Sequence, residues 1–279
     1  MRIVARLLTV LPLLWSEGVW ANVCFGPYTP ETQAEIDAFG TSGCTAIDGN
    51  MVVSTFESGN DIVNLDGLAN LTSVSGNLYI WLEGNTVLTN LDGLSSLKSV
   101  GGKLSIFQTN LTNLDGLSKL SSVGGLEIQM NESLTNADGL ASLTTVNGEL
   151  RIGPTALTDL DALANLEAVA GNLEVNTNFA LTNVDGLRNI KSVGGNLWIL
   201  QNSLLSNCKG IAPVLGWPDG PPDDSVGGEI LIRQNATGCN SVDEVIASVA
   251  SATPVPTLPL FGLGILASLL GLFGLRKLR

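Results

Sequence analysis

The sequence of 279 residues contains no histidine and is poor in positive charge, with 13 Lys and Arg against 26 Asp and Glu. Without histidine the chain cannot build a Ser-His-Asp triad, a Cys-His pair, a His-ligated zinc site or a haem held by an axial His. The net charge of −13 argues against nucleic acid as a partner, because nucleic-acid binders need a basic surface to displace counterions. Since 44% of residues are apolar and 14% are charged, the chain is not an acidic disordered one.

Residues 1–21 are predicted to be a secretory signal peptide. Arg2 and Arg6 provide a positive start, an apolar run follows, and Val19 and Ala21 are the small residues expected before a cleavage site. The chain is therefore expected to be exported.

Residues 258–279 are predicted to be a transmembrane sorting or anchor segment. The 18 residues up to Leu275 carry no charge, which is enough to span a bilayer of about 30 Å, and a basic tail follows them. Together with Val255-Pro-Thr-Leu258 and Phe261-Gly262, this order resembles the IPTL-type (PEP-CTERM-like) tails of bacterial exosortase substrates, with Val for Ile and Phe for Trp. The resemblance implies an exosortase-like processing enzyme as a partner; the alternative is a plain membrane anchor through this C-terminal helix.

Removing both ends makes the exported part more acidic. One acidic and five basic side chains lie outside residues 22–275, namely Glu17, Arg2, Arg6, Arg276, Lys277 and Arg279. Residues 22–275 therefore carry 25 acidic and 8 basic side chains, a net charge near −17. Such a charge keeps the exported part soluble, repels anionic surfaces and is compatible with divalent cations.

The middle of the sequence is an internal repeat. Asp-Gly-Leu (Asp-Ala-Leu in the fifth copy) recurs at spacings of 26, 23, 23, 23 and 24 residues, with its Asp at Asp66, Asp92, Asp115, Asp138, Asp161 and Asp185. A fixed period in this range predicts a solenoid, in which each copy is one coil that buries its apolar side by stacking on its neighbours.

Each copy contains a segment that predicts a β-strand. Leu-x-Ile segments such as Leu78/Ile80 alternate buried and exposed positions, and degenerate copies at Met51/Val53 and Ile230/Ile232 bring the expected parallel sheet to eight strands. Val74 and its counterparts mark a second, shorter strand, and Gly pairs such as Gly101-Gly102 are expected to form the corner between the two.

Two further columns of the repeat are polar. An Asn column after the long strand is predicted to hydrogen-bond the backbone of the next coil, with Thr155 as its exception, at Asn85, Asn110, Asn131, Asn178 and Asn202. The Asp column that begins at Asp66 has two interpretations. Each Asp caps the short turn behind it, with help from the Asn two residues earlier, or the Asn-x-Asp pairs form a calcium ladder. No cofactor other than calcium is suggested.

Four cysteines in an exported chain predict disulfides. Three pairings are possible. Because Cys24 and Cys44 flank the start of the repeat and Cys208 and Cys239 flank its end, the pairs Cys24–Cys44 and Cys208–Cys239 are favoured. Each bond would close a cap, and a helix from an N-cap at Thr29 to Phe39 is expected to cover the first coil.

The repeat resembles the receptor L-domain family. The resemblance rests on Cys44-Thr-Ala-Ile-Asp-Gly-Asn50, the recurring Gly-x-Leu-x-Ile-x-x-Asn-x-x-Leu, and Leu205-Ser-Asn-Cys208. It implies a right-handed, leucine-rich β-helix with disulfide caps. It also implies that this domain is a binding or structural module and not a catalyst. The expected organisation is an all-β solenoid over 44–208, with an N-terminal cap at 22–43, a C-terminal cap with an insertion at 209–240 and a linker at 241–257.

The outward positions of the long strands are the candidate ligand surface. Tyr79, Trp81 and Phe107 fall on adjacent coils, and Trp198 is a fourth outward aromatic residue. An exposed aromatic cluster predicts binding of a glycan or a surface protein, unless the chain's own loops or caps cover it.

Three functional classes remain open. The first is a non-enzymatic protein, anchored to the membrane or cell surface, with a binding or structural role in adhesion or matrix assembly. The second is a calcium-dependent adhesin that uses the Asp column. The third, a carbohydrate-active β-helix enzyme, is disfavoured because the strand faces offer only Glu127, Arg151 and Glu174, which appear scattered in the sequence.

Overall fold

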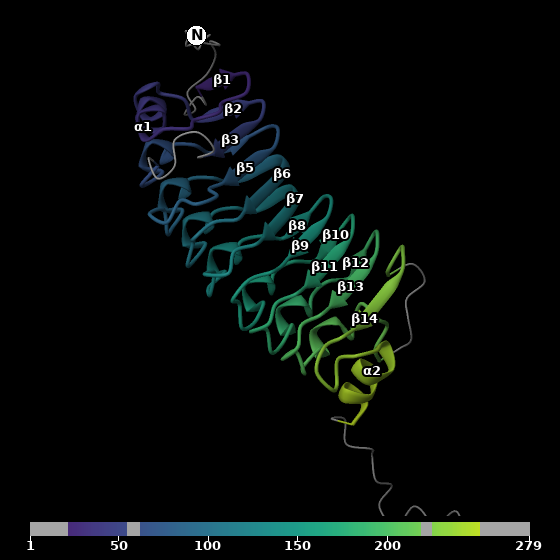
Figure 1. Ribbon diagram of the computed structural model, residues 1–279. Helices are drawn as coiled ribbons and strands as arrows, with labels where there is room; N and C mark the ends of the chain where they lie inside the picture. Colours follow the sequence, from purple (N-terminus) through teal and green to yellow (C-terminus); the bar gives the residue numbers. More distant parts are fainter. Residues whose placement is uncertain (1–21, 55–61, 219–224, 252–279) are drawn as a thin grey trace, which may run out of the picture.

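The computed structural model describes residues 22–54, 62–218 and 225–251. The predicted signal peptide and the predicted segment 258–279 lie outside these residues. Among the described helices, none combines the length and apolar character needed to span a bilayer. The described chain winds into stacked coils that form an elongated solenoid, with β-strands along one side and short helices along another (Figure 1).

One row of the solenoid consists of eight long parallel strands in the described residues. They are β3 (Met51–Ser54), β5 (Leu78–Trp81), β6 (Ser99–Phe107), β7 (Ser122–Gln129), β9 (Leu150–Ile152), β11 (Leu173–Asn176), β13 (Leu197–Leu200) and β14 (Ile230–Arg233). The register places each Leu of the Leu-x-Ile motif beside the Leu of the next coil, as Leu78 pairs with Leu104 and Leu104 with Leu126. This confirms the predicted parallel sheet and its in-register stacking.

A second row contains shorter parallel strands. It runs through β1 (Val23–Phe25), β2 (Ala46–Asp48), β4 (Ser73–Val74), β8 (Thr145–Val146), β10 (Ala168–Val169) and β12 (Ser192–Val193). Strands β6 and β7 continue through both rows, with an irregularity of their pairing between Val100 and Lys103, where the Gly pair lies. In other coils the chain bends at the equivalent positions, as at Gly194-Gly195. Close stacking explains these glycines: a Cβ on Gly102 would lie 2.2 Å from Asn77 Oδ1, and one on Gly101 would lie 2.2 Å from the Ser75 carbonyl oxygen.

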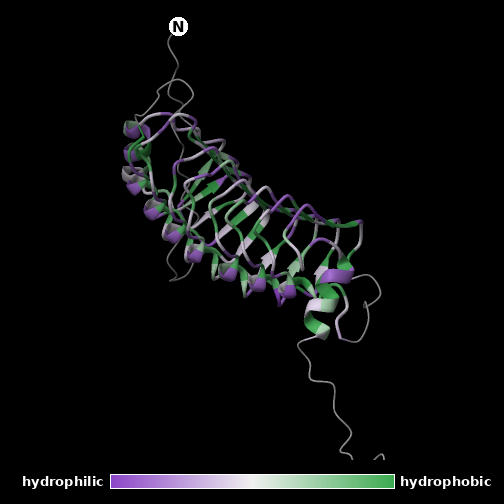
Figure 2. Cartoon of the chain, turned by 60° about the horizontal axis from the view of Figure 1, so that its bottom comes forward, coloured by the Kyte–Doolittle hydropathy of each residue, from purple (hydrophilic) through white to green (hydrophobic). Residues whose placement is uncertain are grey.

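The Asp-Gly-Leu motif forms a 3₁₀-helix in each coil. These helices are η1 (Asp66–Leu68), η2 (Asp92–Leu94), η3 (Asp115–Leu117), η4 (Asp138–Leu140), η5 (Asp161–Leu163) and η6 (Asp185–Leu187), and η7 (Lys209–Ile211) follows them. Figure 2 shows hydrophilic residues recurring along this row. The Leu of each motif is buried, and the Gly stacks on the preceding coil, since a Cβ on Gly116 would lie 1.9 Å from the Leu91 carbonyl oxygen.

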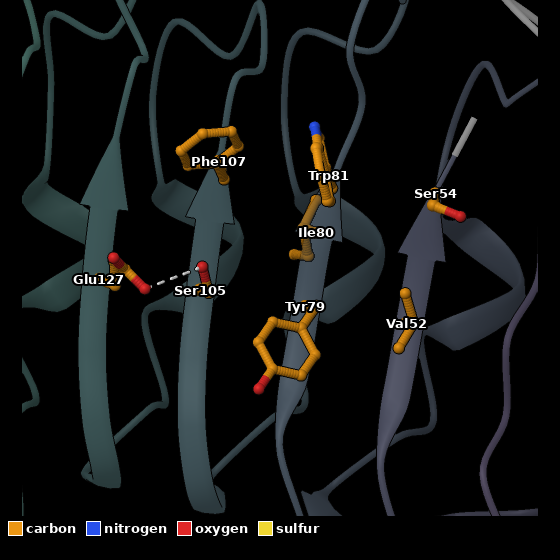
Figure 3. A pocket seen from close by; sticks show the side chains of 8 residues that line it. All are labelled: Val52, Ser54, Tyr79, Ile80, Trp81, Ser105, Phe107 and Glu127. Carbon is orange, nitrogen blue, oxygen red and sulfur yellow. Dashed lines mark hydrogen bonds between the residues drawn. The ribbon is translucent and has the colours of Figure 1, made fainter. Parts of the chain in front are cut away.

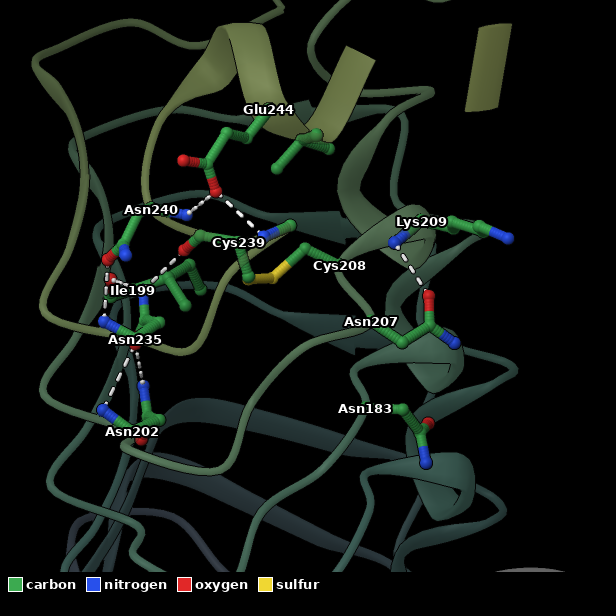
Figure 4. The surroundings of a disulfide bond; sticks show 12 residues. Asn183, Ile199, Asn202, Asn207, Cys208, Lys209, Asn235, Cys239, Asn240 and Glu244 are labelled. Carbon is green, nitrogen blue, oxygen red and sulfur yellow. Dashed lines mark hydrogen bonds between the residues drawn. A yellow bond between two sulfur atoms is a disulfide. The ribbon is translucent and has the colours of Figure 1, made fainter. Parts of the chain in front are cut away.

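A buried ladder of polar side chains runs along the coils where the long strands end. Asn178 donates from Nδ2 to the carbonyl oxygens of Ile152 and Asn176, and the Asn178 backbone N–H donates to Asn202 Oδ1. Asn202 repeats this arrangement with Val175 and Asn235 (Figure 4). The interpretation of this column as structural is confirmed.

The ladder differs from the predicted column at two places. Thr109 occupies it in the third coil, because β6 and β7 pair so that Thr109 meets Asn131: its N–H and hydroxyl both donate to Asn131 Oδ1. Asn110 stands beside the ladder and still makes the predicted bond to a neighbouring coil, from Nδ2 to the Asn85 carbonyl oxygen. Asn235 is an additional member that the sequence analysis did not include. The ladder residue follows a residue at positive φ in several coils, as Thr177 (φ 61°) precedes Asn178, and this conformation turns the chain off the strand.

Both ends of the stack are covered by helices. Helix α1 (Gln33–Thr41) begins at an N-cap on Thr32, not on Thr29, because Thr32 and Glu35 form a reciprocal capping box. Its Ile36 and Phe39 are buried against the first coil, as expected.

At the other end the predicted linker is wrong over part of its length. Residues 242–250 of the stretch 241–257 form helix α2 (Val242–Ala250), whose N-cap Ser241 accepts a hydrogen bond from the Glu244 N–H. Val245 is fully buried, so α2 is part of the C-terminal cap.

The predicted disulfide pairing is confirmed. Cys24–Cys44 has its Cα atoms 5.8 Å apart and Cys208–Cys239 has them 5.5 Å apart, both within the range that a disulfide spans. All four cysteines are buried at the ends of the core. Each bond therefore fixes a cap to the stack.

Candidate functional site

The Asp column does not cap the 3₁₀-helices. The Asn two residues earlier does so, as Asn64 Oδ1 accepts from the Asp66 N–H at 2.9 Å, and Asn90, Asn113, Asn136, Asp159 and Asn183 repeat the bond in the following coils. The carboxylates are mostly exposed; Asp138 accepts from Asn136 Nδ2 and Asp185 accepts from Asn207 Nδ2. The capping interpretation therefore holds for the Asn and is wrong for the Asp.

Calcium along the Asp column stays a prediction with a simple test. No group of three or more Asp, Glu or Cys side chains in the described ranges is arranged to hold a metal ion. We expect the midpoint of thermal unfolding to be the same in millimolar calcium and in chelator. A midpoint several degrees higher in calcium would instead support the adhesin that uses Asp66 and its counterparts.

The outward side chains of β5 and β6 form an apolar hollow on the long-strand face. Trp81 and Phe107 occupy paired positions on the two strands, and their ring centroids lie 5.4 Å apart with the planes at 82°, an edge-to-face contact. Tyr79 lies on the same strand as Trp81, two residues earlier (Figure 3). The hollow has a volume of about 530 Å³, and Val52, Ser54, Ile80, Ser105 and Glu127 complete its lining. We call it the aromatic hollow.

The aromatic hollow is open and partly polar at its border. Tyr79, Trp81 and Phe107 are half-buried, so part of each ring remains accessible. Ser105 donates its hydroxyl to Glu127 Oε2 at 3.4 Å on the side toward β7. The site therefore combines accessible aromatic surface with a few hydrogen-bonding groups, which is the composition of small-ligand sites.

A network of five charged side chains borders the aromatic hollow. Lys103 Nζ lies 3.3 Å from Glu127 Oε2 and 2.6 Å from Glu149 Oε1. Arg151 Nε lies 2.9 Å from Glu174 Oε2, and Arg151 Nη1 lies 3.7 Å from Glu127 Oε1. Glu127, Arg151 and Glu174 are thus not scattered: they lie on β7, β9 and β11 and meet across paired positions of the sheet.

Sequence reasoning missed Lys103 and Glu149. Both occupy the position just before the Leu of the strand motif, and Gly125 occupies the same position in the coil between them. Since Gly125 has no side chain, the Lys103 ammonium reaches Glu149 two coils away. Opposite charges in one repeat column, separated by a glycine, were the available signal.

The network shifts the pKa values of Lys103 and Glu149. The hydrogen bond from Lys103 lowers the pKa of Glu149, more than burial raises it. Burial lowers the pKa of Lys103, but its hydrogen bond to Glu149 and the charge of Glu127 outweigh burial, so the net change is upward. Both groups are therefore held in their charged forms at neutral pH.

These shifts predict a modest pH dependence of stability. Because the folded-state pKa of Glu149 is lowered, its stabilising contribution is present at neutral pH and is lost as the pH falls through that pKa. Because the pKa of Lys103 is raised, its contribution is lost only as the pH rises through the lysine range. Both side chains are about a third exposed, so we expect Glu149→Gln to cost at most about 1 kcal/mol near neutral pH.

The measurement is the urea midpoint of the wild type and of Glu149→Gln from acidic to neutral pH. The difference between the two proteins should shrink toward zero below the ordinary glutamate range. A difference that stays constant with pH would show that the ion pair with Lys103 does not contribute. Lys191, which pairs with Glu167 on an exposed surface at 2.6 Å, offers the matched control Glu167→Gln with a smaller effect.

Trp198 does not join the other predicted ligand residues. It lies on β13, paired with Glu174 of β11 and Leu231 of β14, while the aromatic hollow spans β3 to β7. The charged network lies between them. The structure therefore brings together Tyr79, Trp81 and Phe107 and separates Trp198 from them on the same face.

Comparison with known proteins supports the predicted resemblance over part of the chain. The Receptor L domain family model matches residues 123–202, which begins within β7 and ends just after β13. A search of curated proteins found no match to the chain. The matched coils are similar to a non-enzymatic, ligand-binding extracellular domain, and the two disulfides agree with an exported chain.

Proposed function

We propose that the protein is an exported, non-enzymatic binding protein that captures its ligand on the long-strand face, in the aromatic hollow. The observation that carries the proposal is the clustering of Tyr79, Trp81 and Phe107 in an open hollow of about 530 Å³. Aromatic side chains that remain accessible on a rigid sheet supply large contact area at a low cost in conformational entropy. The similarity of the following coils to the receptor L domain supports the same class of function.

The chemistry of the long-strand face favours binding over catalysis. A glycosidase or lyase needs a carboxylic acid that can give up a proton at its working pH, which requires a raised pKa. Here Glu127, Glu149 and Glu174 all contact Lys103 or Arg151, and the pKa of Glu149 is lowered. The network therefore places ion pairs beside the hollow, and the lowered pKa of Glu149 is opposite to what a general acid needs.

The proposal includes attachment to the cell surface. The uncharged segment up to Leu275 and its basic tail would anchor the chain, and an exosortase-like enzyme would process the tail. The solenoid would then present the aromatic hollow outside the cell, in a role in adhesion or in assembly of the envelope or extracellular matrix. The charge near −17 of the exported part would limit its non-specific contact with anionic surfaces.

The double variant Trp81→Ala/Phe107→Ala tests the proposed binding site. We expect its retention on envelope and matrix material of the source cells to fall at least about tenfold relative to the wild type, because the stacking surface of the hollow is removed. The readout is the bound fraction of purified protein in a sedimentation assay. Trp198→Ala removes an aromatic side chain from the same face and should bind as the wild type does. Equal retention of the double variant and the wild type would exclude the hollow.

A further inference from the structure

The charge of the molecule is distributed unevenly around the solenoid. Residues 22–275 have a net charge near −17, yet the outward positions of the eight long strands carry only five charged residues, whose charges nearly balance: Lys103, Glu127, Arg151, Glu174 and Arg233. The acidic excess lies elsewhere, including the exposed carboxylates that begin the 3₁₀-helices. The long-strand face is therefore a nearly neutral surface on a strongly acidic protein.

This distribution restricts the ligand of the aromatic hollow. An anionic ligand would be repelled by the surrounding acidic surface as it approached. A strongly basic ligand would find more favourable charge on the 3₁₀ side than on the long-strand face, where Lys103 and Arg151 already neutralise the nearby carboxylates. An uncharged ligand is the class that gains most from this face.

The arrangement of rings and polar groups narrows the ligand further. In Figure 3 the Tyr79 ring presents its face, whereas Trp81 is seen edge-on farther along the same strand, across from Phe107. A sugar ring has polarised C–H groups on one face, which pack on the negative face of an aromatic ring, and hydroxyls around its edge. Ser54, Ser105 and Glu127 are the polar residues in the lining of the hollow, and the Glu127 carboxylate, which accepts from the Ser105 hydroxyl, is an acceptor for such hydroxyls.

We infer that the aromatic hollow is a subsite for a neutral glycan, with one sugar ring stacked on the aromatic side chains and its hydroxyls directed to the polar border. The inference rests on the proposed function and specifies its ligand class. The volume of about 530 Å³ falls in the range of about 300–1,000 Å³ of small-ligand sites. The hollow is open at its outer side, so the rest of a glycan chain could extend beyond the bound sugar ring. A polypeptide ligand is the competing outcome of the test.

The test uses the full-length protein in detergent on an array of neutral hexose and N-acetylhexosamine oligosaccharides beside matched uronic-acid and sulfated oligosaccharides. We expect binding to neutral members and at least about tenfold weaker binding to their acidic counterparts. Calorimetric titration with the strongest neutral binder should then show at least about tenfold weaker affinity for Trp81→Ala and for Tyr79→Ala. Trp198→Ala should leave the affinity unchanged, and circular dichroism checks that each variant keeps its strand content.

Binding to no neutral member, equal binding to the acidic members, or affinity that is unchanged in both hollow variants would overturn the inference. The outcomes also separate it from the proposed function. Suppose that Trp81→Ala/Phe107→Ala abolishes retention, and that protease treatment of the cell material removes binding of the wild type whereas periodate oxidation does not. The ligand is then a polypeptide: the glycan inference falls and the hollow remains the binding site. If the double variant is retained as the wild type is, both fall.

Discussion

Replacing Asn178 with alanine is expected to lower the free energy of unfolding by about 3 kcal/mol or more. Asn178 is 1% exposed, and its side chain donates to the carbonyl oxygens of Ile152 and Asn176 and accepts from the Thr155 hydroxyl at 2.7 Å. The substitution leaves these buried groups without partners, and each such group costs about 1–3 kcal/mol. The measurement is urea unfolding monitored by circular dichroism. The wild type and the variant are compared with one common slope of the free energy of unfolding against urea concentration.

Asn189→Ala is the matched control for this prediction. Asn189 also donates from Nδ2 to a carbonyl oxygen of the preceding coil, that of Ala164 at 2.6 Å, but it is exposed. Water can replace the lost bond there, so the expected cost is below about 1 kcal/mol. Equal costs at Asn178 and Asn189 would contradict the view that the buried ladder, rather than hydrogen bonding between coils in general, stabilises the stack.

Removing the Cys208–Cys239 disulfide is the second change with a large expected effect. The bond joins residues 31 apart in the sequence and restricts the conformational entropy of the unfolded chain. Cys208→Ala/Cys239→Ala removes this restriction, which predicts a destabilisation of about 3–4 kcal/mol. The disulfide also holds the chain that enters α2 against the last coil. Hydrogen bonds surround it there: Asn235 Nδ2 donates to the Cys239 carbonyl oxygen at 2.8 Å, and Glu244 accepts from the Gly238 and Asn240 N–H groups (Figure 4). Loss of the bond should therefore loosen the C-terminal cap first.

Hydrogen exchange locates this loosening. In the double variant, amides of β14 and α2 should exchange faster than in the wild type, while those of β5 and β6 at the other end of the stack should change little. This follows from the nearest-neighbour stability of repeat proteins, in which each coil contacts only the coils beside it. Uniform acceleration along the whole chain would show that the coils unfold as one unit, and unchanged exchange at α2 would show that the disulfide does not support the cap.

The repeat made most of the fold predictable. Because Leu-x-Ile and Asp-Gly-Leu recur in a fixed register, the parallel sheet, its eight strands and the turn at each Asp follow from periodicity alone. The positions of the four cysteines at the ends of the repeat were enough to favour the observed pairing. The ladder position shifts where the period is broken: Thr109 occupies it one residue before Asn110, although Asn110 also donates to the backbone of the neighbouring coil, at the Asn85 carbonyl oxygen.

The caps and the charged network were harder to predict for physical reasons. Helix α1 begins at Thr32 because Glu35 completes a capping box, a signal that competed with Thr29 followed by Pro30. Helix α2 is only nine residues long and packs through Val245 against the last coil; its local signal is Ser241-Val-Asp-Glu244 at the helix start, which the sequence analysis did not use. The contact between Lys103 and Glu149 depends on the absent side chain of Gly125, so predicting it requires comparing one repeat column across three coils rather than reading any single copy.

The central claim is that the ligand binds in the aromatic hollow on the long-strand face. Its most direct test is hydroxyl-radical footprinting of the full-length protein with and without ligand-bearing cell material. We predict that Trp81 and Phe107 become protected from oxidation, whereas Trp198 and the exposed Met130 and Phe179 are oxidised equally in both states. Protection of Met130 or Phe179 with none at Trp81 and Phe107 would contradict the claim.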